Sequence, residues 1–74
     1  MNLYKLKKND SFSIVKITRS GEIGKRIAEM GVTKGTRGIV VRKAFLGGPI
    51  QIKILNYDLS LRKDEAESID VEEV

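Results

Sequence analysis

The amino-acid sequence predicts a mainly β fold, a small β-barrel with one short α-helix inserted after the first strand. With 74 residues the chain has room for one hydrophobic core, so we expect residues 1–74 to form a single domain. Several short runs alternate apolar with polar residues, which is typical of strands with one buried face. Because short antiparallel strands expose their edges, closure into a barrel is the simplest arrangement that protects them.

The first strand is expected over residues 12–18, which are rich in β-branched and aromatic side chains. Phe12 and Ile14 share one face of this strand, whereas Val15 and Ile17 share the other. A β-bulge or burial on both faces would account for the broken alternation. An N-terminal segment packed on the core should precede it, contributing Leu3, Tyr4 and Leu6.

The helix is expected to begin at Ser20 and end at Gly31. Ile23, Ile27 and Met30 fall at i, i+4 and i+7, so they form one apolar stripe. The Ser20 hydroxyl can accept a hydrogen bond from an unpaired amide of the first turn. Gly31 suits the left-handed residue that ends many helices.

Four short antiparallel strands are expected after the helix, at residues 37–45, 50–54, 59–62 and 69–71. In the first of them, Ile39 and Val41 share one face. In the second, three isoleucines alternate with polar residues, which makes it the clearest half-buried strand of the chain. Residues 63–67 are expected to form one helical turn, because acidic residues stand near its N-terminal end.

The composition argues against an enzyme and against a metal or other cofactor. The chain contains neither cysteine nor histidine, the donors that zinc and copper prefer. Histidine is also the side chain best suited to move protons near neutral pH. No dinucleotide fingerprint, P-loop or calcium loop is present, and the acidic residues after residue 63 are interpreted as a solvated edge.

The chain also lacks an apolar run of the about 20 residues that a transmembrane helix needs, and it lacks a secretory signal. We therefore expect a cytoplasmic protein with no direct membrane insertion. Its net charge of +4 is uneven, because residues 1–48 carry 11 basic and 3 acidic side chains, whereas the remainder is acidic. A basic surface can attract nucleic acid, anionic membranes or acidic proteins.

The segment Phe45-Leu46-Gly47-Gly48-Pro49 reads as a tight turn that contains two large apolar residues. Such residues either pack back into the core or form a small exposed patch. A domain of this size needs every large side chain in its core, which favours packing back.

Three motifs occur in order along the chain. They are K-R-I-A-E-M-G-V-T-K-G-T at 25–36, A-F-L-G-G-P-I at 44–50 and Y-D-L-S-L-R-K-D-E-A at 57–66. Together they resemble the FeoA family, small cytosolic proteins of bacterial ferrous-iron transport, over nearly the whole chain. Phe45 stands where the family usually has proline, and Gly48 stands where an acidic residue is common.

The resemblance implies an SH3-like β-barrel with a helix after the first strand. It also implies a non-catalytic accessory protein that binds the cytosolic side of a GTP-dependent ferrous-iron transporter of the inner membrane and modulates iron uptake. It does not imply an iron site in this chain. Our candidate partner-binding surface combines the outer helix face with the adjacent turn: Lys25, Arg26, Phe45, Leu46 and Gly47.

Two other functions remain open from the residues alone. Small basic barrels can bind nucleic acid, although single-strand binders usually present more aromatic side chains than the four of this chain. Recognition of proline-rich peptides needs an aromatic-lined groove, and the chain has no tryptophan. We therefore prefer a protein partner and do not expect nucleic-acid binding.

Overall fold

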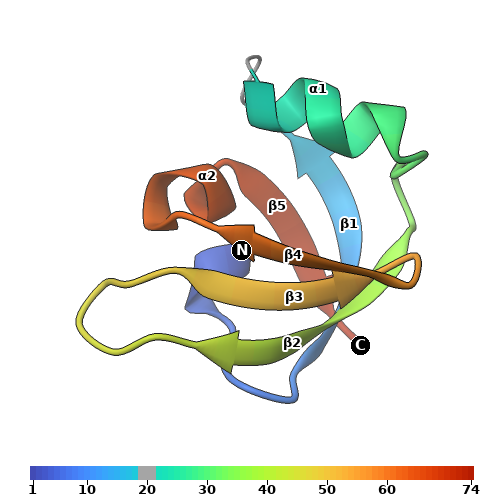
Figure 1. Cartoon of the computed structure of the whole chain (residues 1–74). Coiled ribbons are helices and arrows are strands. Elements are labelled where there is room, and N and C mark those ends of the chain that lie inside the picture. Colours follow the sequence, from blue (N-terminus) through green and yellow to red (C-terminus); the bar gives the residue numbers. More distant parts are fainter. Residues whose placement is uncertain (19–21) are drawn as a thin grey trace.

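The strands are short and have one apolar face, and together they form a single antiparallel sheet that curves around the core (Figure 1). The computed structural model describes residues 1–18 and 22–74. Along the chain its elements are η1 (Leu3–Lys5), β1 (Ser11–Ile17), α1 (Glu22–Glu29), β2 (Arg37–Lys43), β3 (Ile50–Ile54), β4 (Tyr57–Leu61), α2 (Lys63–Glu67) and β5 (Ile69–Glu73). The predicted order of one strand, one helix and four further strands is confirmed.

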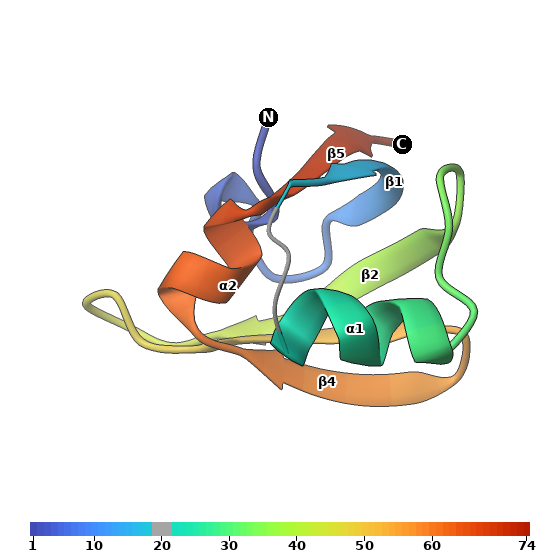
Figure 2. The same ribbon diagram turned by 90° about the horizontal axis from the view of Figure 1, so that it is seen from above.

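The sheet has the strand order β4-β3-β2-β1-β5, and every neighbouring pair is antiparallel. Figure 2 shows β1 and β5 in one layer and β2, β3 and β4 in the other, with the core between them. Both views place α1 over one open end of this barrel (Figures 1 and 2). The ends of the sheet, β4 and β5, are connected through α2, which confirms the helical turn predicted at residues 63–67.

The core is built from side chains of every layer, and all of its members are apolar. Phe12 is fully buried, as predicted, and the three isoleucines of β3 are at most 3% exposed. Ile23 and Ile27 attach α1 to this core, whereas Met30 packs at its margin and stays partly exposed. The apolar stripe of the helix therefore holds it against the open end of the barrel.

The N-terminal segment belongs to the barrel as well. Leu3, the first residue of η1, and Leu6, the residue that follows it, are completely buried. Met1 and Val71 of β5 face each other, because the Val71 amide donates to the Met1 carbonyl at 2.8 Å. The predicted packing of this segment on the core is confirmed for its two leucines.

Local features of β1 and α1 also follow the sequence. The register of β1 against β5 shifts between Ile14 and Lys16, which is the predicted bulge. Gly31 has a φ of +88°, the left-handed conformation expected at the end of the helix. The predicted cap Ser20 lies outside the described residues.

On β2, Ile39 and Val41, which were predicted to share one face, both lie on the more exposed side of the strand. Val40 is fully buried, whereas Ile39 and Val41 are 37% and 36% exposed. The reason is the pairing of Gly38 with Phe12, which turns Gly38 and then Val40 toward the core. Three β-branched residues in a row allow either register, so the sequence alone could not choose between them.

We predict that Gly38→Ala destabilises the fold by about 1–3 kcal/mol, because an added methyl group overpacks the core. A Cβ atom at Gly38 would lie 2.6 Å from the Phe12 ring and 2.9 Å from the Lys53 carbonyl oxygen. Urea unfolding followed by circular dichroism measures the change. Combining Gly38→Ala with Phe12→Leu should recover part of the loss, and an unchanged urea midpoint in the single variant would contradict the prediction.

Candidate partner-binding surface

The loop between β2 and β3 is a closed hairpin that projects from the barrel (Figure 1). Its base is closed by the Ala44 amide, which donates to the Pro49 carbonyl at 2.9 Å. At its tip the Gly48 amide donates to the Phe45 carbonyl at 3.3 Å. Strand β2 therefore ends at Lys43, two residues earlier than predicted, and Phe45 belongs to the loop.

The tip itself is a type I′ turn, because its two central residues, Leu46 and Gly47, have φ of 54° and 78°. Glycine suits this left-handed conformation, whereas a leucine side chain is unfavourable there. Leu55 and Asn56 form a turn of the same kind between β3 and β4, with φ of 50° and 65°. The chain thus places leucine in an unfavourable conformation at both hairpin tips.

Phe45 and Leu46 are exposed to 88% and 90%. The expectation that they pack back into the core is therefore wrong, and they form the exposed patch that we had considered as the alternative. The barrel interior is already occupied by fully buried side chains such as Leu3 and Leu6. The loop that carries the two residues also projects beyond the strands of the sheet (Figure 1).

Tyr4 fixes the base of this loop. Its hydroxyl donates to the Gly48 carbonyl at 2.8 Å, across 44 positions of sequence. The Lys43 ammonium donates to the Tyr4 carbonyl and stands 4.3 Å from the centre of the Tyr4 ring, as in a cation–π contact. From the sequence, Tyr4 was expected only to pack on the core, because no local pattern indicates a hydrogen bond to a residue as distant as Gly48.

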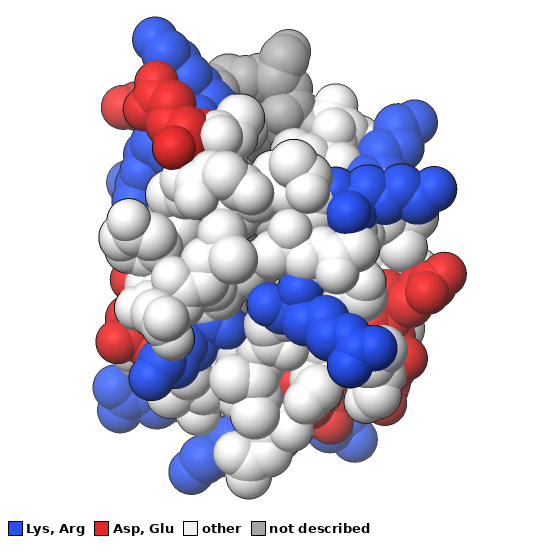
Figure 3. Space-filling model, turned by 90° about the vertical axis from the view of Figure 1, so that its right-hand side faces the viewer, with Lys and Arg blue, Asp and Glu red and all other residues white. Residues whose placement is uncertain are grey.

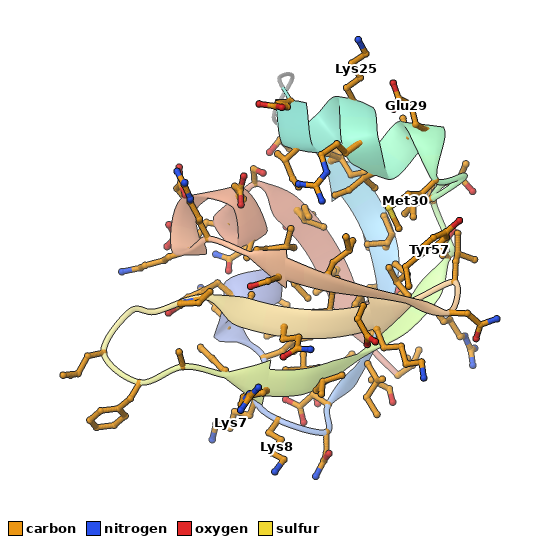
Figure 4. All side chains as sticks on the ribbon, viewed as in Figure 1. Lys7, Lys8, Lys25, Glu29, Met30 and Tyr57 are labelled. Atoms are coloured by element: carbon orange, nitrogen blue, oxygen red, sulfur yellow. The ribbon has the colours of Figure 1, made fainter. Side chains whose placement is uncertain are left out.

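Beneath the loop lies a shallow hollow with a strongly basic lining. It is formed by Tyr4, the apolar loop residues and four basic side chains, namely Lys7, Lys8, Arg42 and Lys43. No carboxylate of the described residues contributes to this lining. Lys7 and Lys8 extend away from the sheet beyond β2 (Figure 4). The hairpin tip and these cations therefore form one surface, which we call the basic loop surface.

A second depression lies between α1 and α2, along the outer edge of β4. It measures 660 Å³ and is lined by Glu22, Ile23, Arg26, Gly47, Gly48, Pro49, Ser60, Arg62 and Glu65. Its lining combines two acidic and two basic residues with the apolar residues Ile23 and Pro49. We call this depression the helix groove.

The five residues predicted from sequence do not form one surface. Arg26 and Gly47 meet in the helix groove. Phe45 and Leu46 lie on the basic loop surface, together with the other side of Gly47. Lys25 stands on the outer face of α1 and points away from the barrel (Figure 4). The structure thus divides our candidate surface into two neighbouring sites that share the loop.

A smaller hollow lies between the end of α1 and β4, where Met30 and Tyr57 both line it, and Arg26 borders it as well as the helix groove (Figure 4). Tyr57 is 55% exposed, so its ring is only partly covered by the barrel. Figure 3 shows this side as a largely uncharged surface on which basic and acidic side chains are dispersed. Positive charge is therefore not gathered on this side.

Within the described ranges, 1–18 and 22–74, no group of three or more acidic side chains is arranged to hold a metal ion. Neither of the helices described there has the length and apolar character needed to cross a bilayer.

The architecture defines a class, the small SH3-like barrels that carry a helix after the first strand. A FeoA protein from Stenotrophomonas maltophilia, solved as a complex with zinc and described as an SH3 domain protein, matches it with a TM-score of 0.83 at 25% identity, over 97% of this chain and 89% of that one. The predicted SH3-like fold is confirmed.

The family follows from the sequence matches. The model of the FeoA domain matches residues 1–73, so the chain belongs to the FeoA family. Iron(II) transport protein A from Clostridium thermocellum is 38% identical, with a TM-score of 0.87 over 100% of this chain and 46% of that one. A curated relative from Porphyromonas gingivalis, an Fe(2+) transport protein A/Fe(2+) transporter FeoB fusion protein, is 39% identical over 72 residues. Those residues are 97% of this chain but 8% of the fusion protein.

We predict that Tyr4→Phe loosens the loop while the barrel stays folded. Loss of the hydroxyl leaves the Gly48 carbonyl without this donor, which should cost about 0.5–1.5 kcal/mol of unfolding free energy. Backbone 15N relaxation should then report larger motion at Gly47 and Gly48 than at the control turn residue Asn56. Unchanged relaxation at both glycines would show that the hydroxyl does not restrain the loop.

Proposed function

We propose that this chain is a non-catalytic accessory protein of ferrous-iron transport that binds the cytosolic side of a GTP-dependent, FeoB-type transporter and modulates iron uptake. One observation carries the proposal: in the Porphyromonas gingivalis relative, a transport protein A and the transporter FeoB are parts of one polypeptide. Fusion keeps two parts at a high effective concentration, which benefits parts that work in contact. A chain similar to the first part is expected to make the same contact between separate molecules.

The helix groove has the character of a protein-binding site. Its apolar centre, provided by Ile23 and Pro49, is surrounded by two acidic and two basic side chains. Such mixed charge favours one partner in one orientation, because like charges facing each other are strongly disfavoured. Arg26 is the basic residue that α1 contributes to this groove. Lys25 points outward from the same helix, where its charge can steer an acidic partner toward it.

A role without catalysis agrees with the chemistry of the residues present. The chain has no cysteine to supply a thiolate, and without histidine a general base would have to be a carboxylate, lysine or tyrosine. The groove lining contains no pair of a hydroxyl nucleophile and a base in hydrogen-bond contact among the described residues. Regulation would therefore act through the transporter, by altering its nucleotide turnover or its opening.

We predict that Arg26→Glu weakens binding to a purified FeoB transporter in detergent by about tenfold, which corresponds to about 1.4 kcal/mol. Interferometry with the transporter immobilised, and loaded in turn with GDP and a GTP analogue, measures this change. Lys34→Glu makes the same charge change in an exposed turn outside the groove and should leave the affinity nearly unchanged.

The variants test the role of the helix groove, whereas the unchanged protein tests whether the transporter is bound at all. Equal weakening by the Arg26 and Lys34 variants would mean that overall charge, and not the groove, governs the contact. Absence of binding by the unchanged protein in every nucleotide state would contradict the proposed function. Tight binding of labelled RNA or DNA at low salt would instead favour the nucleic-acid alternative.

A further inference from the structure

We propose that the basic loop surface binds an anionic lipid bilayer, with Phe45 and Leu46 entering the interface and the exposed side chains of Lys7, Lys8 and Arg42 facing the lipid phosphates. The inference deepens the proposed function, since it names the lipid next to the transporter as a second partner. It also revises the sequence-based expectation of no direct membrane insertion. That expectation considered long apolar segments, whereas the structure shows a two-residue tip.

The apolar part of this surface is unusual for its exposure. Phe45 and Leu46 are 88% and 90% exposed, whereas the next most exposed large apolar side chain, Val74, is 58% exposed. They are consecutive and occupy the end of a hairpin, so both can enter a soft interface together. Water-exposed phenylalanine and leucine gain free energy when they enter the region between lipid headgroups and acyl chains.

The charge around the tip complements an anionic membrane. All four charged side chains that line the hollow are basic, and Tyr4 adds an aromatic ring of the kind enriched at membrane interfaces. The nearby Asp10 carboxylate accepts a hydrogen bond from the backbone amide of Lys7 at 2.8 Å. Each lysine or arginine held near an anionic leaflet adds attraction that decays within a Debye length.

The shape favours lipid over an acidic protein. The tip is convex and narrow, and its base is fixed by the Tyr4 hydroxyl and by the hydrogen bond between Ala44 and Pro49. A protein partner would have to offer a matching pocket to bury both side chains, whereas a bilayer interface accepts a protruding apolar tip without one. An apolar tip flanked by lysine and arginine is the arrangement that peripheral membrane proteins use.

The turn conformation allows a clean test. Because Leu46 has a φ of 54°, Leu46→Asn places a residue that prefers this conformation at the same position. The variant should fold at least as well as the unchanged protein while losing an apolar contact. Leu55, with a φ of 50° at the tip between β3 and β4, provides the matched control Leu55→Asn.

The experiment measures binding of the purified chain to vesicles that contain no transporter. We expect sedimentation with vesicles of phosphatidylglycerol and phosphatidylcholine, and much weaker binding to phosphatidylcholine alone. Leu46→Asn combined with Phe45→Ser should weaken binding by about tenfold or more. Lys7→Gln and Lys8→Gln should each weaken it by about fivefold and reduce its dependence on salt. Leu55→Asn should bind like the unchanged protein.

Insertion can also be observed directly. The chain contains no tryptophan, so Phe45→Trp introduces a single reporter. Its emission should shift to the blue with anionic vesicles, and an unshifted spectrum would show that the tip stays in water. Absence of vesicle binding, or equal loss in the Leu46 and Leu55 variants, would overturn the inference.

The transporter contact and the lipid contact can be contradicted independently of each other. Binding to the transporter in detergent with no binding to vesicles would overturn the lipid contact alone. If the Phe45 and Leu46 variants then lost affinity for the detergent-solubilised transporter, the tip would be a protein contact. Vesicle binding without transporter binding would contradict the proposed function and leave the lipid contact in place.

Discussion

The contact between the Phe12 ring and the backbone at Gly38 is the constraint on which the sheet depends. Because no side chain separates them, β1 and β2 approach closely enough to bury the ring completely. The same pairing turns Val40 inward and thereby fixes which residues of β2 face solvent. At the far end of β2, beyond a register shift against β3, Lys43 reaches Tyr4, and Tyr4 in turn holds the projecting loop.

Much of this architecture can be predicted from the sequence. The spacing of apolar residues within a single strand or helix shows which of its side chains are buried. The isoleucines of β3, the stripe of α1 and the bulge in β1 are examples. The face of β2 could not be predicted, since consecutive β-branched residues fit either register. The contact of Tyr4 with Gly48 joins positions far apart in sequence and leaves no local pattern.

The arrangement of the candidate site residues could not be predicted either, because it also depends on contacts between distant segments. Residue types drew attention to the helix and to the loop, but periodicity cannot say whether two such segments share a face. Arg26 and Gly47 meet in the helix groove, whereas Phe45 and Leu46 lie on the basic loop surface. The size of the core argued for burying the two apolar residues, yet the core was already complete without them. The residues predicted to form one surface therefore line two separate hollows.

The hairpin is held by groups other than the two side chains that we propose to contact the bilayer. Backbone hydrogen bonds, two glycines and the Tyr4 hydroxyl hold the turn, and none of them uses the side chains of Phe45 or Leu46. Those two positions can therefore change by drift or by design while the barrel keeps its shape. Exchanging this dipeptide offers a way to redirect an otherwise identical domain to a different cellular surface.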